Sequence, residues 1–280
     1  MGRVTDRRRV LRVEAHRQVT RPDTLVAEEP LEIRVGGEPL TVTMRTPGDD
    51  FDLVAGFLAT EDVVTKPDDL LGMRYCAGKD DEGRNTYNVV DATLAPGLSA
   101  PLLDVTRNFY TTSSCGICGK ASLDAVRLNQ PYDLGTDPTA VHVDTLWSLP
   151  DRLRQEQQVF ERTGGLHAAG LFTADGELVC LREDIGRHNA LDKLVGWALR
   201  QEMLPLAGHL VLLSGRASFE LVQKALLAGV PVVAAVSAPS TLAVDLADEA
   251  SMTLVGFLRG ETMNVYTHTA RLTGLADVSP

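Results

Sequence analysis

The chain has 280 residues, a formal net charge of −11 at pH 7, 44% apolar residues and 23% charged residues. This length and apolar content suffice for one large or two modest globular domains, while the acidity argues against bulk attraction to nucleic acid. No run of 18 apolar residues occurs, and basic residues 1–13 contain no apolar segment, so we expect a cytoplasmic protein with neither a membrane span nor a secretory signal.

Residues 1–27 are polar and rich in arginine, which is typical of a solvated or edge segment. Residues 31–35 and 40–44 then alternate apolar and polar side chains around two glycines, and this pattern predicts a β-hairpin. Apolar residues at helical spacing predict a helix over residues 51–58. Further strands are expected at residues 73–76, 86–90 and 102–105. We therefore expect a small α+β domain within residues 1–107.

Two of the four cysteines lie three residues apart in Cys115-Gly116-Ile117-Cys118. The neighbouring residues are small, so they leave both sulfur atoms accessible. Residues 121–128 have the apolar content of a helix, which would place Cys118 near a helix N-terminus, where the backbone dipole favours a thiolate. We expect residues 108–143 to comprise this loop, a short helix and a linker.

Three kinds of chemistry use such a thiol pair. Structural zinc needs a second ligand pair, which the sequence lacks, and zinc deaminases carry a His-x-Glu element upstream of their cysteines. Here His167-Ala168-Ala169 lies downstream and has no glutamate, so we expect no metal. A thioredoxin-like pair follows the first strand of a βαβ unit, unlike this pair. A persulfide carrier needs an accessible thiolate, which this segment offers, although the spacing alone does not select it over redox exchange.

Residues 144–280 have the pattern of an α/β domain. A helix is predicted to begin at residue 144, and a short antiparallel hairpin is predicted at residues 171–173 and 178–181. Apolar runs then alternate with short helices, which predicts a parallel sheet with helices on its faces. The runs are residues 210–213, 230–236 and 254–258, and the helices are residues 218–227 and 241–249.

Small or basic residues follow each of these apolar runs. They are Ser214-Gly215-Arg216, Ser237-Ala238-Pro239-Ser240 and Arg259-Gly260-Glu261. Ligands of open parallel sheets bind at the carboxyl ends of the strands, where Gly and Ser turns, helix N-termini and arginine suit phosphate groups. We expect a pyrophosphate or nucleotide ligand there, with ordinary strand–helix turns as the alternative.

Six ionisable residues surround one glycine at the start of a predicted helix. They are Arg182, Glu183, Asp184, Arg187, His188 and Asp192. This mixture favours a functional site, and the alternative is a structural network of ion pairs.

Several stretches resemble one family, the formate dehydrogenase accessory sulfurtransferases or FdhD family. They occur in the family's order between about residues 28 and 270. They are residues 44–49, 56–58, 114–119, 183–193, 214–216, 237–240, 256–260 and 264–267. The Cys115 and Cys118 stretch and residues 183–193 are the most specific of these.

The resemblance implies an α/β fold, α+β overall, with a cytidine-deaminase-like α/β domain at residues 144–280 after the smaller N-terminal domain. It implies a sulfurtransferase that takes sulfur from a cysteine desulfurase as a persulfide on Cys115. Cys118 is the second candidate catalytic thiol, because a second nearby thiol can release or relay the sulfur. The acceptor would be the bis-molybdopterin guanine dinucleotide cofactor needed for formate dehydrogenase activity. The resemblance also implies a homodimer.

The implied cofactor-binding residues are Phe257, Leu258, Arg259, Gly260, Glu261 and Thr262. The strand-end and helix-start patterns add Ser214, Arg216, Arg187 and His188 as candidates. We expect a GDP-like nucleotide to mimic the cofactor, whose metal is molybdenum or tungsten. The alternative function is a non-catalytic chaperone that holds the cofactor, with the cysteines used for docking or redox sensing.

Overall fold

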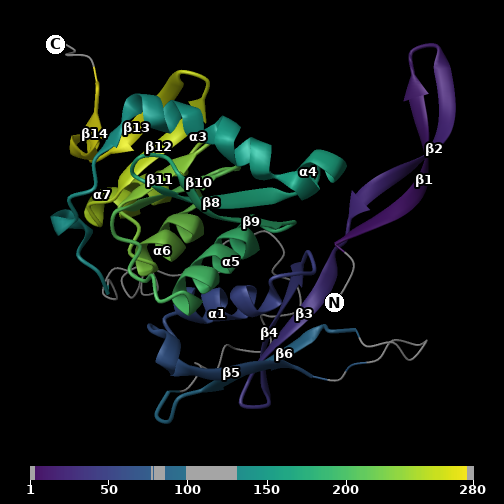
Figure 1. The fold of residues 1–280 in the computed structure, drawn as a ribbon, viewed down its shortest axis with the longest axis horizontal. Helices are drawn as coiled ribbons and strands as arrows, with labels where there is room; N and C mark the ends of the chain where they lie inside the picture. The colour runs from purple at the N-terminus through teal and green to yellow at the C-terminus, as the bar shows by residue number, and fades with distance from the viewer. Residues whose placement is uncertain (1–3, 77, 79–85, 99–130, 276–280) are drawn as a thin grey trace.

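The computed structural model describes residues 4–76, 78, 86–98 and 131–275 of the chain. Two β-sheets with helices between them form the body, and a two-stranded ribbon projects from it (Figure 1). The mixed α/β class predicted from the sequence is confirmed. Within the described ranges, no helix is both long and apolar enough to cross a membrane.

The N-terminal ribbon is an element that the sequence did not predict. It consists of β1 (Thr5–Glu14) and β2 (Arg17–Val26), which pair antiparallel along their whole length. Most of its side chains are exposed. The expectation of a solvent-facing segment therefore holds for residues 4–26, but these residues form regular strands.

Residues 29–94 form the smaller sheet and the helix that covers it. The elements are β3 (Glu29–Val35), β4 (Glu38–Arg45), α1 (Asp50–Thr60), the 3-10 turn η1 (Pro67–Asp69), β5 (Leu70–Tyr75) and β6 (Val89–Leu94). The strand order is β4-β3-β6-β5. Antiparallel pairing of β3 with β4 confirms the predicted hairpin, and Gly36 and Gly37 supply the positive φ angles of its turn. The strand expected at residues 102–105 lies outside the described residues.

The larger sheet has six strands in the order β13-β12-β11-β10-β8-β9. Its strands are β8 (His167–Thr173), β9 (Leu178–Asp184), β10 (His209–Leu213), β11 (Val232–Ala235), β12 (Thr253–Arg259) and β13 (Thr262–Thr267). The pairs β10–β11 and β11–β12 are parallel, and β8–β9 is antiparallel, as predicted. One expectation was incomplete: β12 leads into a hairpin with antiparallel β13, so Arg259-Gly260-Glu261 is a β-turn and no helix follows it.

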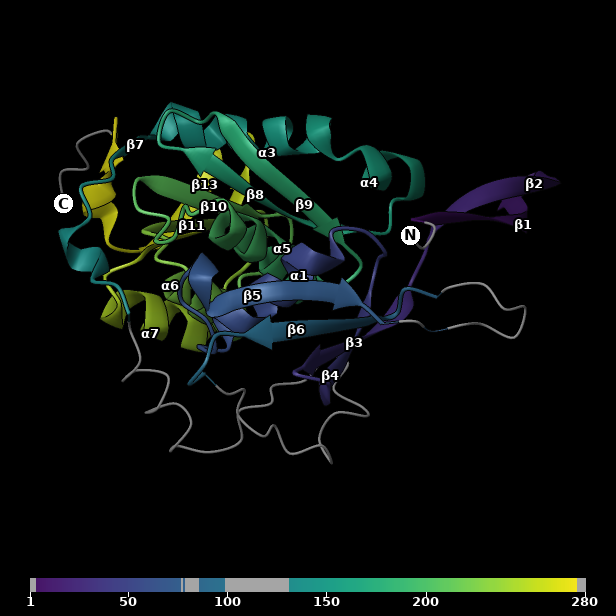
Figure 2. The same ribbon diagram turned by 60° about the horizontal axis from the view of Figure 1, so that its bottom comes forward.

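Helices cover both faces of the larger sheet (Figure 2). They are α3 (Val143–Glu156), α4 (Gln158–Thr163), α5 (Arg187–Arg200), α6 (Phe219–Leu227) and α7 (Thr241–Glu249). Two apolar clusters lie on the two sides of the sheet, and the larger cluster continues through α5 and α1 into the smaller sheet. Short elements complete the fold: η3 (Leu134–Thr136), β7 (Val141–His142), η4 (Thr269–Arg271) and β14 (Leu272–Thr273).

Two glycines allow α1 and α5 to cross in backbone contact. A Cβ atom added to Gly56 would lie 1.7 Å from the carbonyl oxygen of Asp192, and one added to Gly196 would lie 1.8 Å from that of Asp52. Any side chain at either position would separate the helices. The crossing therefore joins the smaller sheet to the larger one through a shared apolar core.

The sequence predicted two domain boundaries, one at residue 107 and one at residues 143–144. The boundary at residue 107 lies outside the described residues. The boundary at residues 143–144 coincides with the start of α3 at Val143. The division into three segments stays a prediction.

Candidate functional site

The predicted strand-end turns lie on the side of the larger sheet where β10, β11 and β12 end. We call this side the sheet edge. The turn after β10 bonds to the turn after β11, because the Ser237 amide donates to the Gly215 carbonyl at 3.3 Å. The Phe257 amide in turn donates to the Ser237 carbonyl at 3.2 Å. The ends of β9 and β12 and the start of β8 share this edge because of the strand directions. The structure thus brings the first two predicted turns together, and the third turn begins at Arg259, two residues beyond the contact at Phe257.

The Phe257–Thr262 stretch has a mixed environment. Phe257 has a left-handed backbone (φ 53°) within an irregular part of β12, and the Arg259 guanidinium lies 5.7 Å from its ring centroid. Arg259, Gly260, Glu261 and Thr262 are exposed in the β12–β13 turn. The Leu258 side chain is fully buried in the core, so it cannot contact a ligand in this state.

Two predicted residues near Ser214 differ in what they can offer a ligand. The Ser214 hydroxyl accepts the Ala168 amide at 2.8 Å, which ties the turn to β8. Arg216 is exposed and forms no hydrogen bond or ion pair within the part of the chain that the structure describes. Arg216 is therefore free to bind an anion, whereas Ser214 is already engaged.

His167, at the start of β8, was not among the predicted ligand-binding residues. Its ring lies against the backbone of Gly215, where an added Cβ would be 3.3 Å from Nδ1. Burial lowers the pKa of His167, and the nearby charges of Arg187 and His188 lower it further. We therefore expect the His167 imidazole to be neutral at pH 7, beside the Ser214-Gly215-Arg216 turn that was predicted to bind a phosphate group.

Arg187 is the first residue of α5, and its Nε atom is buried without a hydrogen-bond partner among the described residues. A buried guanidinium N–H left unpaired is costly, and an anion is its natural partner. Arg187 therefore brings an unsatisfied donor to the same sheet edge as His167.

A cavity of about 580 Å³ opens between this edge and helices α3 and α4. Leu153, Gln157, Phe160, His167, Ser214 and Val236 are among its lining residues. The Arg154 guanidinium lies 4.0 Å from the Phe160 ring centroid at its wall. Apolar walls with a few convergent polar groups are typical of small-molecule sites.

Gln157 is the residue of this cavity that sequence reasoning missed entirely. It is only 5% exposed, and its Nε2 has no hydrogen-bond partner within the described ranges. It links α3 to α4, and no local motif marks it in the sequence. A buried, unpaired amide facing a cavity points to a ligand that supplies the missing acceptor.

The charged stretch at residues 182–193 serves mainly to join the two sheets. Asp184 and Lys193 form a buried ion pair at 2.7 Å. Asp184 also accepts the Thr46 amide at 3.1 Å, while Lys193 donates to the Thr46 carbonyl at 2.9 Å. Asn189 donates to the Met44 carbonyl at 2.7 Å. These residues thus form a network of structural contacts, as the alternative reading expected, whereas Arg187 faces the sheet edge.

Glu183 and Arg182 have structural contacts of their own. Glu183 accepts the amides of Val159 and Phe160 at 3.2 and 3.0 Å, so it holds the start of α4 at the cavity wall. Arg182 pairs with Asp52 of α1 at 2.8 Å.

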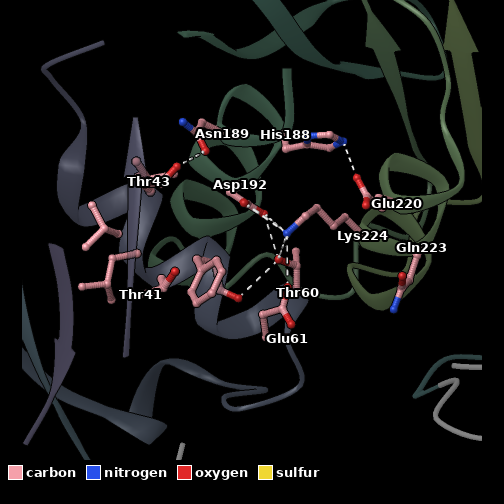
Figure 3. A pocket seen from close by; sticks show the side chains of 14 residues that line it. Thr41, Thr43, Thr60, Glu61, His188, Asn189, Asp192, Glu220, Gln223 and Lys224 are labelled. Atoms are coloured by element: carbon pink, nitrogen blue, oxygen red, sulfur yellow. Dashed lines mark hydrogen bonds and ion pairs between the residues drawn. The ribbon is translucent and has the colours of Figure 1, made fainter. Parts of the chain in front are cut away.

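A second cavity, of about 450 Å³, lies between the smaller sheet and helices α5 and α6 (Figure 3). The buried Lys224 ammonium bonds there to Asp192 at 2.9 Å and to the Thr60 hydroxyl at 2.8 Å. His188 faces this cavity and lies 2.8 Å from Glu220, whose pKa it lowers by hydrogen bonding. His188 is thus engaged by Glu220 beside the Lys224 cluster.

Replacing Lys224 by methionine should destabilise the fold strongly, because Asp192 would be left as an uncompensated buried charge. Loss of one partner of such a pair costs about 3–5 kcal/mol of the free energy of unfolding. Denaturant unfolding measures this cost. Gln223→Met, at the neighbouring position in the same cavity, is the control and should change stability little. If Lys224→Met unfolds at the wild-type denaturant concentration, the buried pair contributes nothing.

The four cysteines fall into two groups. Cys115 and Cys118 lie outside the described residues. Cys180 is buried, as predicted, and burial raises its pKa to about 12, so it is a core thiol; Cys76 is half-buried. In the described part of the chain, no group of His, Cys, Asp and Glu side chains is arranged to hold a metal ion.

Comparison with known proteins agrees with this architecture. The chain is 62% identical over 273 residues to the sulfur carrier protein FdhD of Streptomyces coelicolor, covering 97% of both chains. It is 59% identical to the protein of that name from Mycolicibacterium paratuberculosis (96% of this chain, 99% of the relative) and 40% identical to that from Sulfurisphaera tokodaii (94% and 97%).

A solved structure shares the fold. It is described as a candidate formate dehydrogenase accessory protein from Desulfotalea psychrophila, with a TM-score of 0.75 at 20% identity, covering 96% of this chain and 100% of that one. The model of the FdhD/NarQ family matches residues 26–273. On this match and on the identity to its relatives, the chain belongs to the FdhD/NarQ family.

Proposed function

We propose that this chain is a cytoplasmic sulfurtransferase. It receives sulfur from a cysteine desulfurase as a persulfide on Cys115 and transfers it to the bis-molybdopterin guanine dinucleotide cofactor required by formate dehydrogenase. The main support for a role in sulfur transfer is the 62% identity, over nearly the whole chain, to a relative named as a sulfur carrier. The Cys115 and Cys118 pair supplies the thiols that such a function needs.

The sulfur transfer can be written as two balanced exchanges. The Cys115 thiolate attacks the outer sulfur of the donor's persulfide, a new S–S bond forms, and the donor leaves as a thiolate. The Cys118 thiolate then attacks the inner sulfur at Cys115, which releases hydrosulfide to the cofactor and leaves a disulfide between the two cysteines. A cellular dithiol reductant reopens that disulfide.

The cofactor's guanine nucleotide is a suitable ligand for the edge of the larger sheet. The unpaired Nε of Arg187 and the free Arg216 provide cationic donors for its phosphates. The cavity beside them has an unpaired amide at Gln157 and an aromatic wall at Phe160, which suit a purine base. Arg259 would add charge at the far end of the same edge.

Titration of the chain with GDP tests this assignment. We expect wild-type protein to bind GDP, and Arg187→Gln, Gln157→Leu and Arg259→Ala each to weaken binding, because each removes a donor or a charge from the bound nucleotide. A hydrogen bond to a charged group is worth about 1.5–3 kcal/mol, so Arg187→Gln should raise the Kd about tenfold or more. Isothermal titration calorimetry measures these values.

The control is Arg74→Gln, which removes an exposed guanidinium from β5 in the smaller sheet. Its GDP affinity should equal that of the wild type. Unchanged affinity in the Arg187, Gln157 and Arg259 variants would place the nucleotide elsewhere on the chain.

A further inference from the structure

The β1–β2 ribbon projects from the body of the molecule (Figure 1). At its base, Val26 packs against Gly165, where an added Cβ would lie 3.3 Å from Val26 Cγ1. Farther out, residues 11–18 are exposed on both faces of the ribbon. The match to the family model starts at residue 26, so nearly the whole ribbon lies outside the matched part of the chain. Neither the sheet edge nor the thiol pair accounts for this ribbon.

The pairing of the ribbon shows which of its backbone groups are free. In an antiparallel pair, residues that exchange two hydrogen bonds alternate with residues that exchange none. Arg9 lies opposite Pro22, which has no N–H group, so this pair is of the second kind. The Arg7 amide, two residues earlier, donates to the Asp6 carboxylate at 2.8 Å, which agrees with this alternation. Every second residue of β1 therefore directs its amide and carbonyl away from β2. In the outer half of β1 these residues are Arg9, Leu11 and Val13.

The two outer edges of the ribbon differ in what they offer a further strand. No third strand pairs with β1 or β2 among the described residues. On β2, Pro22 interrupts the row of outward amides, and a proline on an edge strand blocks pairing with another chain. β1 contains no proline. Its outer edge, which we call the β1 edge, is therefore open to an added strand.

The side chains beside the β1 edge change from basic to apolar along the strand. Arg7, Arg9, Leu11 and Val13 share one face of the ribbon, because alternate residues of a strand point the same way. Leu11 and Val13, which lie toward the tip, are 59% and 64% exposed. A strand added at this edge would gain apolar contacts near the tip and would meet two arginines nearer the base.

The uncompensated charge of β1 lies on this same face. On the opposite face, Arg8 pairs with Asp6 at 2.9 Å, and Arg12 pairs with Glu14 at 3.0 Å. The two arginines beside the β1 edge form no ion pair with any residue that the structure describes. Acidic side chains directly across from them on an added strand would supply the missing counter-charges.

The charge of the rest of the chain limits what kind of partner fits. Residues 1–26 hold seven arginines and three acidic residues, so the remainder carries a formal charge of −15. Nucleic acid or an anionic membrane would bring extended negative charge close to this acidic body. A single polypeptide segment can contact the ribbon alone. These charges therefore favour a short acidic segment.

We propose that the β1 edge binds an extended, acidic segment of a partner protein as a third strand of the ribbon. Antiparallel pairing is the more stable arrangement. In that direction the apolar residues of the segment come first, beside Val13 and Leu11, and its acidic residues follow at alternate positions, beside Arg9 and Arg7. Backbone hydrogen bonds supply the affinity, and the alternate side chains supply the specificity.

A fluorescently labelled peptide of sequence VTVTETET has this pattern, and its binding to the full chain can be measured by fluorescence polarisation. We expect the wild type to bind it. The peptide VVTTEETT has the same composition and charge without the alternation, so it should bind about tenfold more weakly. The peptide VTVTKTKT should not bind, because its lysines would face the two arginines.

Arginine variants test the charged part of the contact. Arg7→Gln with Arg9→Gln should raise the Kd for VTVTETET about fivefold or more, because two ion pairs are lost. The control is Arg17→Gln with Arg21→Gln, which removes two exposed arginines from the opposite face of the ribbon. The control should change the Kd by less than about twofold.

Proline variants test the backbone part of the contact. Leu11 lies directly opposite Thr20, and the amides of both point outward, so proline at either position keeps the hydrogen bonds between β1 and β2. Leu11→Pro should abolish peptide binding, whereas Thr20→Pro, on the other edge, should preserve it. Leu11→Ala keeps the amide donor and should bind more tightly than Leu11→Pro.

Three results would each overturn the proposal. They are no binding of VTVTETET by the wild type, equal binding of VVTTEETT, and equal binding by Leu11→Pro and the wild type. Displacement of the peptide by phosphatidylserine vesicles at equal charge would also overturn it, because the ribbon would then bind anionic surfaces by charge alone. None of these measurements depends on sulfur transfer.

Discussion

Replacing Cys115 by serine should abolish sulfur transfer and, in cells, the activity of the dependent formate dehydrogenase. A hydroxyl cannot form the S–S bond that carries the sulfur, so the loss should be complete rather than graded. Mass spectrometry after incubation with a cysteine desulfurase and cysteine should detect one added sulfur atom on the wild-type Cys115 peptide. The serine variant should show none there. The fold should be unaffected, which circular dichroism would verify.

Cys76→Ser is the matched control, because Cys76 is a half-buried thiol directly after β5 of the smaller sheet, distant in sequence from the pair. It should keep wild-type sulfur loading and formate dehydrogenase activity. Active formate dehydrogenase in cells that contain only the Cys115→Ser chain would contradict the sulfurtransferase role. That result would favour the alternative, a chaperone that holds the cofactor without carrying sulfur.

Alanine at Gly56 or Gly196 should destabilise the fold strongly. Helix propensity alone predicts the opposite, since alanine stabilises a helix interior by about 1 kcal/mol relative to glycine. Here the added Cβ would lie 1.7 or 1.8 Å from a backbone carbonyl oxygen, which cannot rotate away as a side chain can. We expect the free energy of unfolding to fall by about 3 kcal/mol or more. Tm should fall by roughly 6–12 °C for a chain of this size.

Gly72→Ala provides the control for the glycine variants. Gly72 lies in β5, its φ is not left-handed, and an added Cβ would have no heavy atom within 4 Å. Its Tm should stay close to that of the wild type in differential scanning calorimetry. Equal Tm values for Gly56→Ala and Gly72→Ala would mean that α1 and α5 can separate without cost.

Local patterns predicted most elements of the fold because their signals come from neighbouring residues. The β3–β4 hairpin, α1 and the alternation of β10, β11 and β12 with α6 and α7 follow from turn chemistry and hydrophobic periodicity. The patterns did not predict β1 and β2, because the many arginines there indicated a solvated segment rather than regular strands. The β12–β13 hairpin was not predicted either, because Arg259-Gly260-Glu261 suits a β-turn as well as a strand–helix turn.

Candidate site residues could be predicted where they belong to a sequence motif. They could not be predicted where only their packing in the fold marks them. Arg187 was found through its charged motif, whereas the neighbouring Asp184 and Lys193 proved to bind each other and the backbone of Thr46. Gln157 had no distinguishing sequence context, and His167 was considered only as a zinc ligand. Their relevance follows from burial and from the cavity that they line.

The α/β class, the thiol pair at Cys115 and Cys118 and the resemblance to the family could all be read from the sequence, because each depends on residue types at short spacing. The three-dimensional fold was needed to tell which charges join the two sheets and which stay available at the sheet edge, since burial and pairing depend on residues far apart in the chain. The crossing at Gly56 and Gly196 is the clearest case. In sequence these glycines weaken two helices; in three dimensions they let the helix backbones touch and unite the core.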